Sequence, residues 1–161
     1  MAESQGSQYL IALGSNQRHP GFGSPEAILR HAACSIGEIL GDVLATSRII
    51  RSAPVGPSTR QYANGALVVG SDLPPLNMLD GLQMIESQFG RRRVGRRWRA
   101  RTLDLDIVLW SEGLFASPDL LIPHPMFRQR GFVLGPASEI APDWRDPVTG
   151  LTLRQLRARL R

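Results

Sequence analysis

The residues best suited to chemistry are two carboxylates, Asp104 and Asp106, in the run Leu103-Asp104-Leu105-Asp106-Ile107. On a β-strand, residues two apart point to the same face about 7 Å from each other, and the flanking apolar residues are then buried on the opposite face. Two carboxylates on one side of a core strand repel each other unless a cation lies between them. Oxygen ligands of this kind suit Mg²⁺. Considered alone, the pair is equally compatible with two solvated acids on an open sheet face.

A cluster of arginines directly precedes this pair. The chain contains 19 arginines and no lysine, and seven of the arginines lie in the eleven positions 91–101. Outside that window 12 arginines stand against 14 acidic residues, so one short segment carries the whole excess behind the net charge of +5. We therefore expect a local anion site rather than a generally basic surface. Guanidinium groups beside paired carboxylates are typical of phosphoryl transfer, whereas the segment alone is also compatible with a solvated or RNA-binding loop.

Aromatic and amide side chains offer a second kind of contact. Trp98 lies among the arginines, where it could stack on a base or close a site. Tyr62 and Asn64 share one face of a predicted strand, and an asparagine presents both a donor and an acceptor to the edge of a heterocycle. The alternative is a core tyrosine beside an internally satisfied asparagine.

Two further positions are weaker candidates. Gln83 and Glu86 are three apart on a predicted helix, off its apolar stripe, and considered alone they are typical helix-surface residues. His124 lies between two prolines in a stiff loop. It could hydrogen-bond the loop or contact a phosphate.

The elements that must position these residues follow from hydrophobic periodicity and turn residues. Strands are expected at residues 9–13, 43–52, 61–70 and 103–110, with one helix capped by Ser24 and ended by Gly41 and a second helix after Pro75. This order predicts a ferredoxin-like α+β sandwich, in which helices pack on an antiparallel sheet. A proline-rich loop at 117–125 and extra C-terminal helical segments, at 132–140 and around residues 153–160, are expected to follow.

Length and composition indicate the domain organisation and the cellular location. A chain of 161 residues fits a single domain over residues 1–161, with residues 1–8 as a flexible N-terminus. No apolar run approaches membrane-spanning length and the N-terminal residues lack a secretory pattern, so we expect a cytoplasmic monomer with no membrane partner. Cys34 is the single cysteine, which excludes an intrachain disulfide. We expect it to be a small buried apolar side chain.

Four separated stretches, taken in order, carry a family resemblance: Ala12-Leu13-Gly14-Ser15-Asn16; Pro54-Val55-Gly56-Pro57 with Tyr62-Ala63-Asn64; the run from Arg97 to Ile107; and Pro123-His124-Pro125 with Arg130-Gly131-Phe132. Together they resemble the 6-hydroxymethyl-7,8-dihydropterin pyrophosphokinase (HPPK) family of folate biosynthesis. The resemblance extends over roughly residues 9–142. Four matches in the right order are far more specific than any one of them.

The resemblance implies a similar fold and a transfer of the β,γ-diphosphate of ATP to the pterin hydroxymethyl group, releasing AMP, with two Mg²⁺ ions. It implies that Asp104 and Asp106 ligate both ions, and that Arg91, Arg93 and Arg101 line the triphosphate, with Arg91 and Arg101 among the catalytic residues. The implied ATP contacts are Gln83, Glu86, Arg93, Trp98, Arg101, Ile107, His124 and Arg130. The implied pterin contacts are Ser52, Pro54, Val55, Tyr62, Asn64 and Phe132.

The chain departs from the family pattern at a few positions, which are Arg99, Asp119, Leu121 and Pro125. The alternative from another class is a ferredoxin-like RNA-binding module that uses the arginine segment. Such a module needs aromatic residues interleaved on its central strands, and this chain lacks that pattern. Asp104 and Asp106 would also repel a phosphate backbone in the absence of metal. We therefore expect small-molecule substrates and no nucleic-acid partner.

Overall fold

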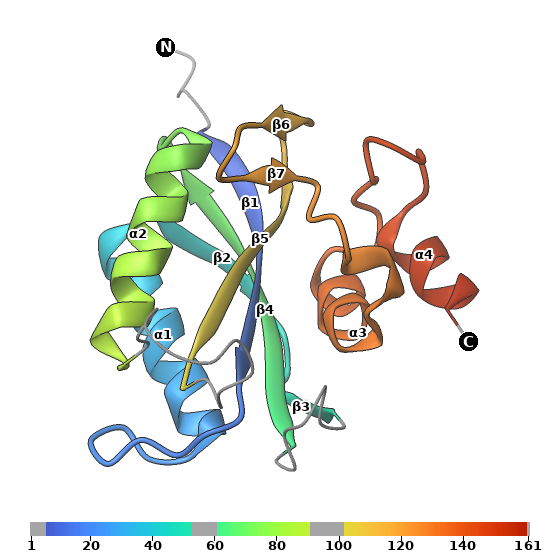
Figure 1. The fold of residues 1–161 in the computed structure, drawn as a ribbon. Coiled ribbons are helices and arrows are strands. Elements are labelled where there is room, and N and C mark those ends of the chain that lie inside the picture. Colours follow the sequence, from blue (N-terminus) through green and yellow to red (C-terminus); the bar gives the residue numbers. More distant parts are fainter. Residues whose placement is uncertain (1–5, 53–60, 91–101, 161) are drawn as a thin grey trace.

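The computed structural model of the protein describes residues 6–52, 61–90 and 102–160 (Figure 1). The strands are β1 (Ser7–Ser15), β2 (Asp42–Thr46), β3 (Ile50–Ser52), β4 (Tyr62–Ser71), β5 (Asp104–Trp110), β6 (Phe115–Ala116) and β7 (Leu121–Ile122). The helices are α1 (Pro25–Ile39), α2 (Pro75–Gln88), α3 (Gly131–Ile140) and α4 (Leu153–Arg159), with a 3₁₀ turn η1 (Phe127–Gln129) before α3. None of the described helices is long and apolar enough to cross a membrane.

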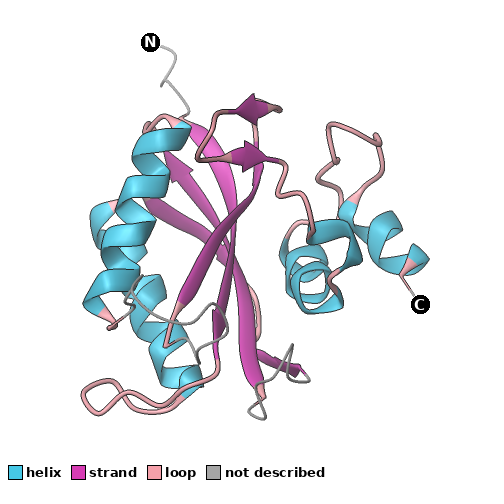
Figure 2. Cartoon of the chain, in the orientation of Figure 1, coloured by secondary structure: helices cyan, strands magenta, loops and turns pink. Residues whose placement is uncertain are grey.

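The main sheet has the strand order β2-β4-β1-β5, and every pairing in it is antiparallel, as is the pairing of β3 with β4 (Figure 2). The helix α1 follows β1 and leads to β2, and β4 lies between these two strands. The helix α2 connects β4 to β5 in the same way. This is the split β-α-β arrangement that the element order predicts, so the expected ferredoxin-like fold is confirmed.

Helices cover both faces of the sheet. The helices α1 and α2 lie on one face, and α3 and α4 lie on the other (Figure 1). Along β4, Ala63 and Leu67 enter the core beneath α1 and α2, whereas Ala66 and Val68 enter the core beneath α3 and α4. The expected period-two alternation of β4 is therefore confirmed, and the two C-terminal helices close a second core rather than extend the first one.

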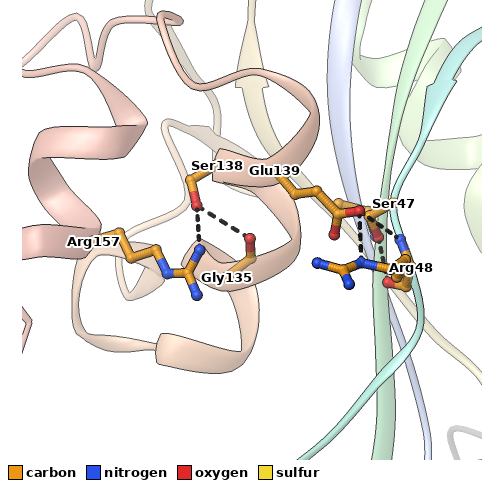
Figure 3. Close-up of polar contacts among 7 residues, drawn as sticks. Ser47, Arg48, Gly135, Ser138, Glu139 and Arg157 are labelled. Carbon is orange, nitrogen blue, oxygen red and sulfur yellow. Dashed lines mark hydrogen bonds and ion pairs between the residues drawn. The ribbon is translucent and has the colours of Figure 1, made fainter.

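The C-terminal layer is fastened to the sheet by neighbouring residues of α3 that point in different directions (Figure 3). Glu139 Oε1 accepts hydrogen bonds from the backbone N–H and the Nε of Arg48, at 3.3 and 3.1 Å, in the segment between β2 and β3. Ser138 faces α4, where its Oγ accepts from Arg157 Nη1 at 3.4 Å. The helix α3 is thus tied to an edge of the sheet on one side and to α4 on the other.

At the two ends of α1, the expected cap at Ser24 is confirmed, whereas the role expected for Gly41 was wrong. Ser24 caps the helix, because its Oγ accepts from the Ala27 N–H at 3.3 Å. Gly41 follows the cap residue Leu40, but its φ lies outside the left-handed region that a glycine cap uses. A Cβ at Gly41 would instead collide with the carbonyl oxygen of Gly70. Glycine is needed there for close backbone approach.

Three other expectations were wrong in detail. The strand expected at 43–52 is two strands, because Ser47 Oγ accepts from the Ala66 N–H at 2.8 Å and interrupts the ladder. The loop expected at 117–125 contains β7, which pairs with β6 in a small separate hairpin. Cys34 is exposed rather than buried, since it lies on the side of α1 that faces away from the core.

Candidate functional site

The two aspartates lie at the start of β5, half-buried, on the face of the sheet that α3 covers. Their apolar neighbours Leu103, Leu105 and Ile107 are almost fully buried in the core beneath α1 and α2. The alternation that the sequence predicts is therefore confirmed from Leu103 to Val108. Beyond that point the alternation expected to Trp110 was wrong, because the pairing with β1 shifts register and Leu109 enters the same core as Val108. Backbone pairing places Asp106 opposite Ala12 of β1, so the neighbouring strand fixes where the carboxylates sit.

A narrow pocket opens beside these carboxylates, and we call it the carboxylate pocket. Its walls come from β1, β4, β5 and α3, with Arg130 directly before α3. They are formed by Ala12, Leu13, Gly14, Tyr62, Asn64, Asp104, Asp106, Arg130, Phe132 and Val133. Six of the residues singled out from the sequence meet in this one place. They come from segments far apart in the chain, and folding brings an aromatic pair, an amide, an arginine and two carboxylates together.

The amide of Asn64 is held by a neighbouring strand. Asn64 is 4% exposed, and its Nδ2 donates to Ser52 Oγ on β3 at 2.7 Å. Pairing of Ser52 with Tyr62 and of Ile50 with Asn64 sets this contact. The structure therefore brings Ser52 to the pocket through Asn64, and the hydrogen bond orients the amide that the pocket presents.

The arginine and the second aromatic ring enter from the C-terminal side. Arg130 caps the start of α3, where its carbonyl accepts from the N–H groups of Val133 and Leu134, each at 3.0 Å. Its guanidinium carbon lies 5.7 Å from the ring centre of Phe132. The cation thus lies within the range of a cation–π contact with a ring that lines the same pocket as Tyr62.

A second pocket adjoins the first at Asp106, and we call it the histidine pocket. It is lined by Leu79, Leu105, Asp106, Ile107, Pro118, Asp119, Leu120, Leu121, His124 and Pro125. Two of the ATP contacts implied by the resemblance, Ile107 and His124, lie here. The histidine pocket also contains Asp119, Leu121 and Pro125, three of the positions that depart from the family pattern.

The surroundings of His124 favour its neutral form. Burial lowers the pKa of His124, the charge of Arg130 lowers it further, and Asp104 acts in the opposite direction. Its Nδ1 accepts from the Met126 N–H at 3.1 Å, and its own backbone N–H donates to the carbonyl of Val108 on β5 at 3.0 Å. With Nδ1 accepting, the neutral ring carries its proton on Nε2, which leaves that atom as a donor.

Glu86 is the clearest surprise among the predicted residues. Considered alone it was expected on the surface of α2, but it is 3% exposed, and its Oε2 accepts from the backbone N–H of Leu105 at 2.9 Å. A helix residue off the apolar stripe can still face the sheet where a strand end offers an unpaired N–H. Gln83 is half-buried on the same helix. Neither residue lines the two pockets as the described residues form them.

Several predicted residues lie outside the described part of the chain. They are the arginines and the tryptophan of the cluster, Arg91, Arg93, Trp98 and Arg101, and the two pterin contacts Pro54 and Val55. These six stay predictions from the sequence. Gly14, by contrast, lines the carboxylate pocket although it was singled out only as part of a motif. A glycine that directly ends a buried apolar run was the available signal.

The acids of the carboxylate pocket suit Mg²⁺ as a ligand set. Asp104 and Asp106 are half-buried acids on one strand face, and both line the carboxylate pocket. Within the described ranges no group of three or more His, Cys, Asp or Glu side chains is placed to hold a metal by itself. Mg²⁺ characteristically takes one or two carboxylates and completes its shell with water and substrate phosphates. The two aspartates therefore fit Mg²⁺ bound together with a phosphate substrate.

Comparison with known proteins identifies the family. The family described as 7,8-dihydro-6-hydroxymethylpterin-pyrophosphokinase (HPPK) matches residues 10–142. The chain is 40% identical over 148 residues to the 2-amino-4-hydroxy-6-hydroxymethyldihydropteridine pyrophosphokinase of Synechocystis sp., covering 91% of this chain and 73% of that protein. It is 41% identical over 140 residues to the protein of that name from Pseudomonas aeruginosa, covering 85% of this chain and 82% of that one. The chain belongs to the HPPK family.

The fold agrees with solved structures of larger proteins. The wild-type Plasmodium falciparum HPPK-DHPS crystal structure superposes with a TM-score of 0.76 over 98% of this chain, at 15% sequence identity. This chain spans 45% of the length of that one. At such low identity the likeness concerns the fold alone, and it confirms the sandwich with its C-terminal helices.

Proposed function

We propose that this protein is an ATP-dependent diphosphotransferase of folate biosynthesis, which transfers the β,γ-diphosphate of ATP to the hydroxyl of 6-hydroxymethyl-7,8-dihydropterin. The observation that carries the proposal is the carboxylate pocket, where Asp104 and Asp106 lie beside Tyr62, Asn64 and Phe132. Aromatic rings and an amide suit a flat heterocycle with polar edges, and paired carboxylates suit a phosphate-bound cation. Family membership supports the same reaction.

The proposed reaction is a group transfer that involves no change of oxidation state. The hydroxymethyl oxygen attacks the β-phosphorus of ATP, and the bond between that phosphorus and the oxygen bridging it to the α-phosphorus breaks. AMP leaves with that oxygen, the pterin carries the diphosphate, and the hydroxyl proton passes to solvent. Such a transfer needs little beyond positioning and charge stabilisation, so no protein base is required.

On the pterin side, Tyr62 and Phe132 would stack on the two faces of the ring and Asn64 would contact its edge. The hydrogen bond from Asn64 Nδ2 to Ser52 Oγ supports this role, because it fixes the amide before substrate arrives. Pro54 and Val55 would contact the same edge. Aromatic walls would keep water from the two faces of the ring, which would strengthen the hydrogen bonds at its edge.

On the nucleotide side, Arg130 would face the phosphates, and His124 would offer its Nε2 proton as a hydrogen-bond donor. Arg91, Arg93 and Arg101 would neutralise charge on the triphosphate, and Trp98 would close over the nucleotide. Ile107, Gln83 and Glu86 would complete the ATP contacts. The histidine pocket adjoins the carboxylate pocket at Asp106. ATP bound in the histidine pocket would therefore direct its phosphates toward the carboxylate pocket.

We propose that Asp104 and Asp106 hold two Mg²⁺ ions together with the phosphate oxygens of ATP. When bound, these ions would supply charge neutralisation of the phosphates and of the leaving oxygen. The aspartates themselves contribute position, since β5 holds them on one face beside Arg130 and Asn64. We further propose that the protein acts in the cytoplasm, where ATP is available, and as a monomer, because one chain supplies both pockets.

The test is direct. Purified protein is incubated with ATP, 6-hydroxymethyl-7,8-dihydropterin and Mg²⁺, and nucleotide products are separated by chromatography. The expected result is AMP in equal amount to pterin diphosphate, dependent on pterin. Formation of ADP, or of no pterin-dependent AMP, would overturn the proposal. Thermal melting distinguishes the RNA-binding alternative, since Mg-ATP should raise the melting temperature and a short RNA should not.

A further inference from the structure

Asp146 is the most completely buried acid among the described residues, and it lies outside both pockets. Its side chain has no solvent exposure, and it accepts four hydrogen bonds. Arg128 donates to both carboxylate oxygens, from Nε at 2.6 Å and from Nη2 at 2.8 Å. Thr149 Oγ1 donates at 2.7 Å and the Val148 N–H at 3.0 Å. A forked pair of this kind fixes direction as well as distance.

The pair joins two segments that are otherwise separate in the chain. Asp146 belongs to the loop between α3 and α4, which is itself closed by hydrogen bonds of the Asp146 backbone to Gly150 and Leu151, each at 2.8 Å. Arg128 belongs to η1, where its guanidinium carbon lies 4.7 Å from the centre of the buried Phe127 ring. The loop thus holds η1 through a bidentate ion pair packed on an aromatic ring.

The turn η1 leads directly into the pocket wall. The Arg130 N–H donates to the carbonyl of Phe127 at 3.2 Å, and Arg130 then starts α3, which carries Phe132. On its other side η1 is linked to β5 by two hydrogen bonds. The Phe127 N–H donates to the carbonyl of His124 at 3.4 Å, and the His124 N–H donates to the carbonyl of Val108. The segment from His124 to Phe132 is therefore anchored to β5 at one end and to Asp146 in its middle.

We infer that Arg128 and Asp146 are positioning residues for the proposed reaction, which hold Arg130 and Phe132 at the correct place opposite Asp104 and Asp106. This inference rests on the proposed function. Neither residue touches the carboxylate pocket, and Asp146 lies beyond residues 10–142, the range that matches the family. The loop between α3 and α4 thereby becomes part of what sets substrate affinity.

If Arg128 and Asp146 only stabilised the fold, their variants would show different kinetics from those of positioning residues. Loss of folded protein lowers the active fraction, so it lowers the apparent kcat and leaves both KM values unchanged. A displaced wall acts on the bound substrates, because Phe132 belongs to the pterin side and Arg130 to the phosphate side. Mispositioning therefore raises KM for pterin and for ATP together, and a shift of about 1 Å can cost about 100-fold in kcat/KM.

The experiment compares wild type with Asp146→Asn and Arg128→Lys. Asp146→Asn keeps the shape but presents an amide to the guanidinium, and Arg128→Lys keeps the charge but loses the fork. Both variants should raise the two KM values, with kcat/KM lower by about 10- to 100-fold for Asp146→Asn and by less for Arg128→Lys. If Asp146→Asn does not fold, the KM values of Arg128→Lys alone test the inference. The Arg128 side chain is partly exposed, so we expect this variant to fold.

Two controls separate the outcomes. Asp143→Asn removes an exposed ion pair with Arg154 in the same loop region, and it should change neither KM. Ile36→Ala destabilises the core on the opposite face of the sheet, and it should lower the melting temperature without changing either KM. Wild-type KM values in folded Asp146→Asn or Arg128→Lys, or equal KM increases in Ile36→Ala, would overturn the inference. Absence of pterin-dependent AMP from wild type would instead overturn the proposed function.

Discussion

Asn64 and Asp104 lie on opposite sides of a single residue. Gly14 of β1 pairs with Asn64 of β4 along one edge and with Asp104 of β5 along the other. The two side chains that the proposed function assigns to pterin and to metal are therefore separated by two strand spacings, about 10 Å between their Cα atoms. Because cross-strand neighbours point to the same face, Gly14 forms the floor between them.

A larger side chain at Gly14 should block the pterin. The φ of Gly14 is not positive, so substitution causes no backbone strain there, and a Cβ would lie 3.5 Å from Asn64 Oδ1 and 3.8 Å from Tyr62 Cδ1. We expect Gly14→Val to raise KM for pterin by about tenfold or more, since it fills the floor of a narrow pocket. Gly14→Ala is the matched control and should change KM much less. Steady-state kinetics measures both, and a wild-type KM for pterin in Gly14→Val would contradict the prediction.

Removing either aspartate charge should abolish turnover. We expect Asp104→Asn and Asp106→Asn each to lower kcat by about 1,000-fold or more, because each removes a charged oxygen ligand from the phosphate site. Both residues are half-buried, and the core contacts of this stretch of β5 are made by Leu103, Leu105 and Ile107 on the other face, so the melting temperature should be retained. Asp80→Asn, an exposed change on α2, serves as the control. Normal AMP formation by either variant would refute the assignment.

Glu86 should stabilise the fold through its hydrogen bond to β5, in addition to its proposed contact with ATP. Glu86→Ala leaves the buried Leu105 N–H without this acceptor, which should lower the free energy of unfolding by about 1–3 kcal/mol. Glu86→Gln keeps an acceptor oxygen and should recover most of that loss. Urea denaturation followed by circular dichroism gives both values. Equal stability of Glu86→Ala and wild type would show that the hydrogen bond contributes nothing.

Acid stability should depend on Asp146. Burial alone would raise its pKa, but the hydrogen bonds from Arg128, Thr149 and the Val148 N–H outweigh burial and lower the pKa to about 2. A folded-state pKa below the unfolded value means that the stabilisation is present above about pH 4 and is lost as the pH falls toward 2. The shift corresponds to about 2 kcal/mol.

The measurement is the free energy of unfolding from pH 7 to pH 2 for wild type and Asp146→Asn. The difference between the two should be constant above about pH 4 and should shrink by about 2 kcal/mol at lower pH, because protonation removes the charge that the variant lacks throughout. Arg128 stays protonated over this range, so it adds no titration of its own. A difference independent of pH would contradict this account.

The sequence was most informative where local pattern and tertiary environment agree. The alternation around Asp104 and Asp106 predicted a strand with one buried face, and the sheet supplies that burial. The same reasoning placed Tyr62 and Asn64 on a common face, and the pocket confirms that they lie together. The order of strands and helices was sufficient for the fold, since few topologies satisfy it.

The wrong expectations share a physical cause. Cys34 was expected to be buried from its residue type, yet its place on α1 depends on which side of the helix the sheet covers. Glu86 looked like a surface residue because no sequence pattern shows that Leu105 presents an N–H to α2. The β6–β7 hairpin and the close approach of Gly41 to Gly70 also depend on contacts between distant segments.

The core beneath α3 and α4 bears on how fragments and fusions of this protein should be designed. A fragment ending at Pro142 would contain every proposed substrate contact and the whole range that matches the family. It would lack Asp146 and also Leu153 and Leu156, which close that core. Such a fragment would expose apolar surface and release η1, so a fusion partner should be joined after α4. The unit to be expressed is set by packing rather than by the extent of sequence similarity.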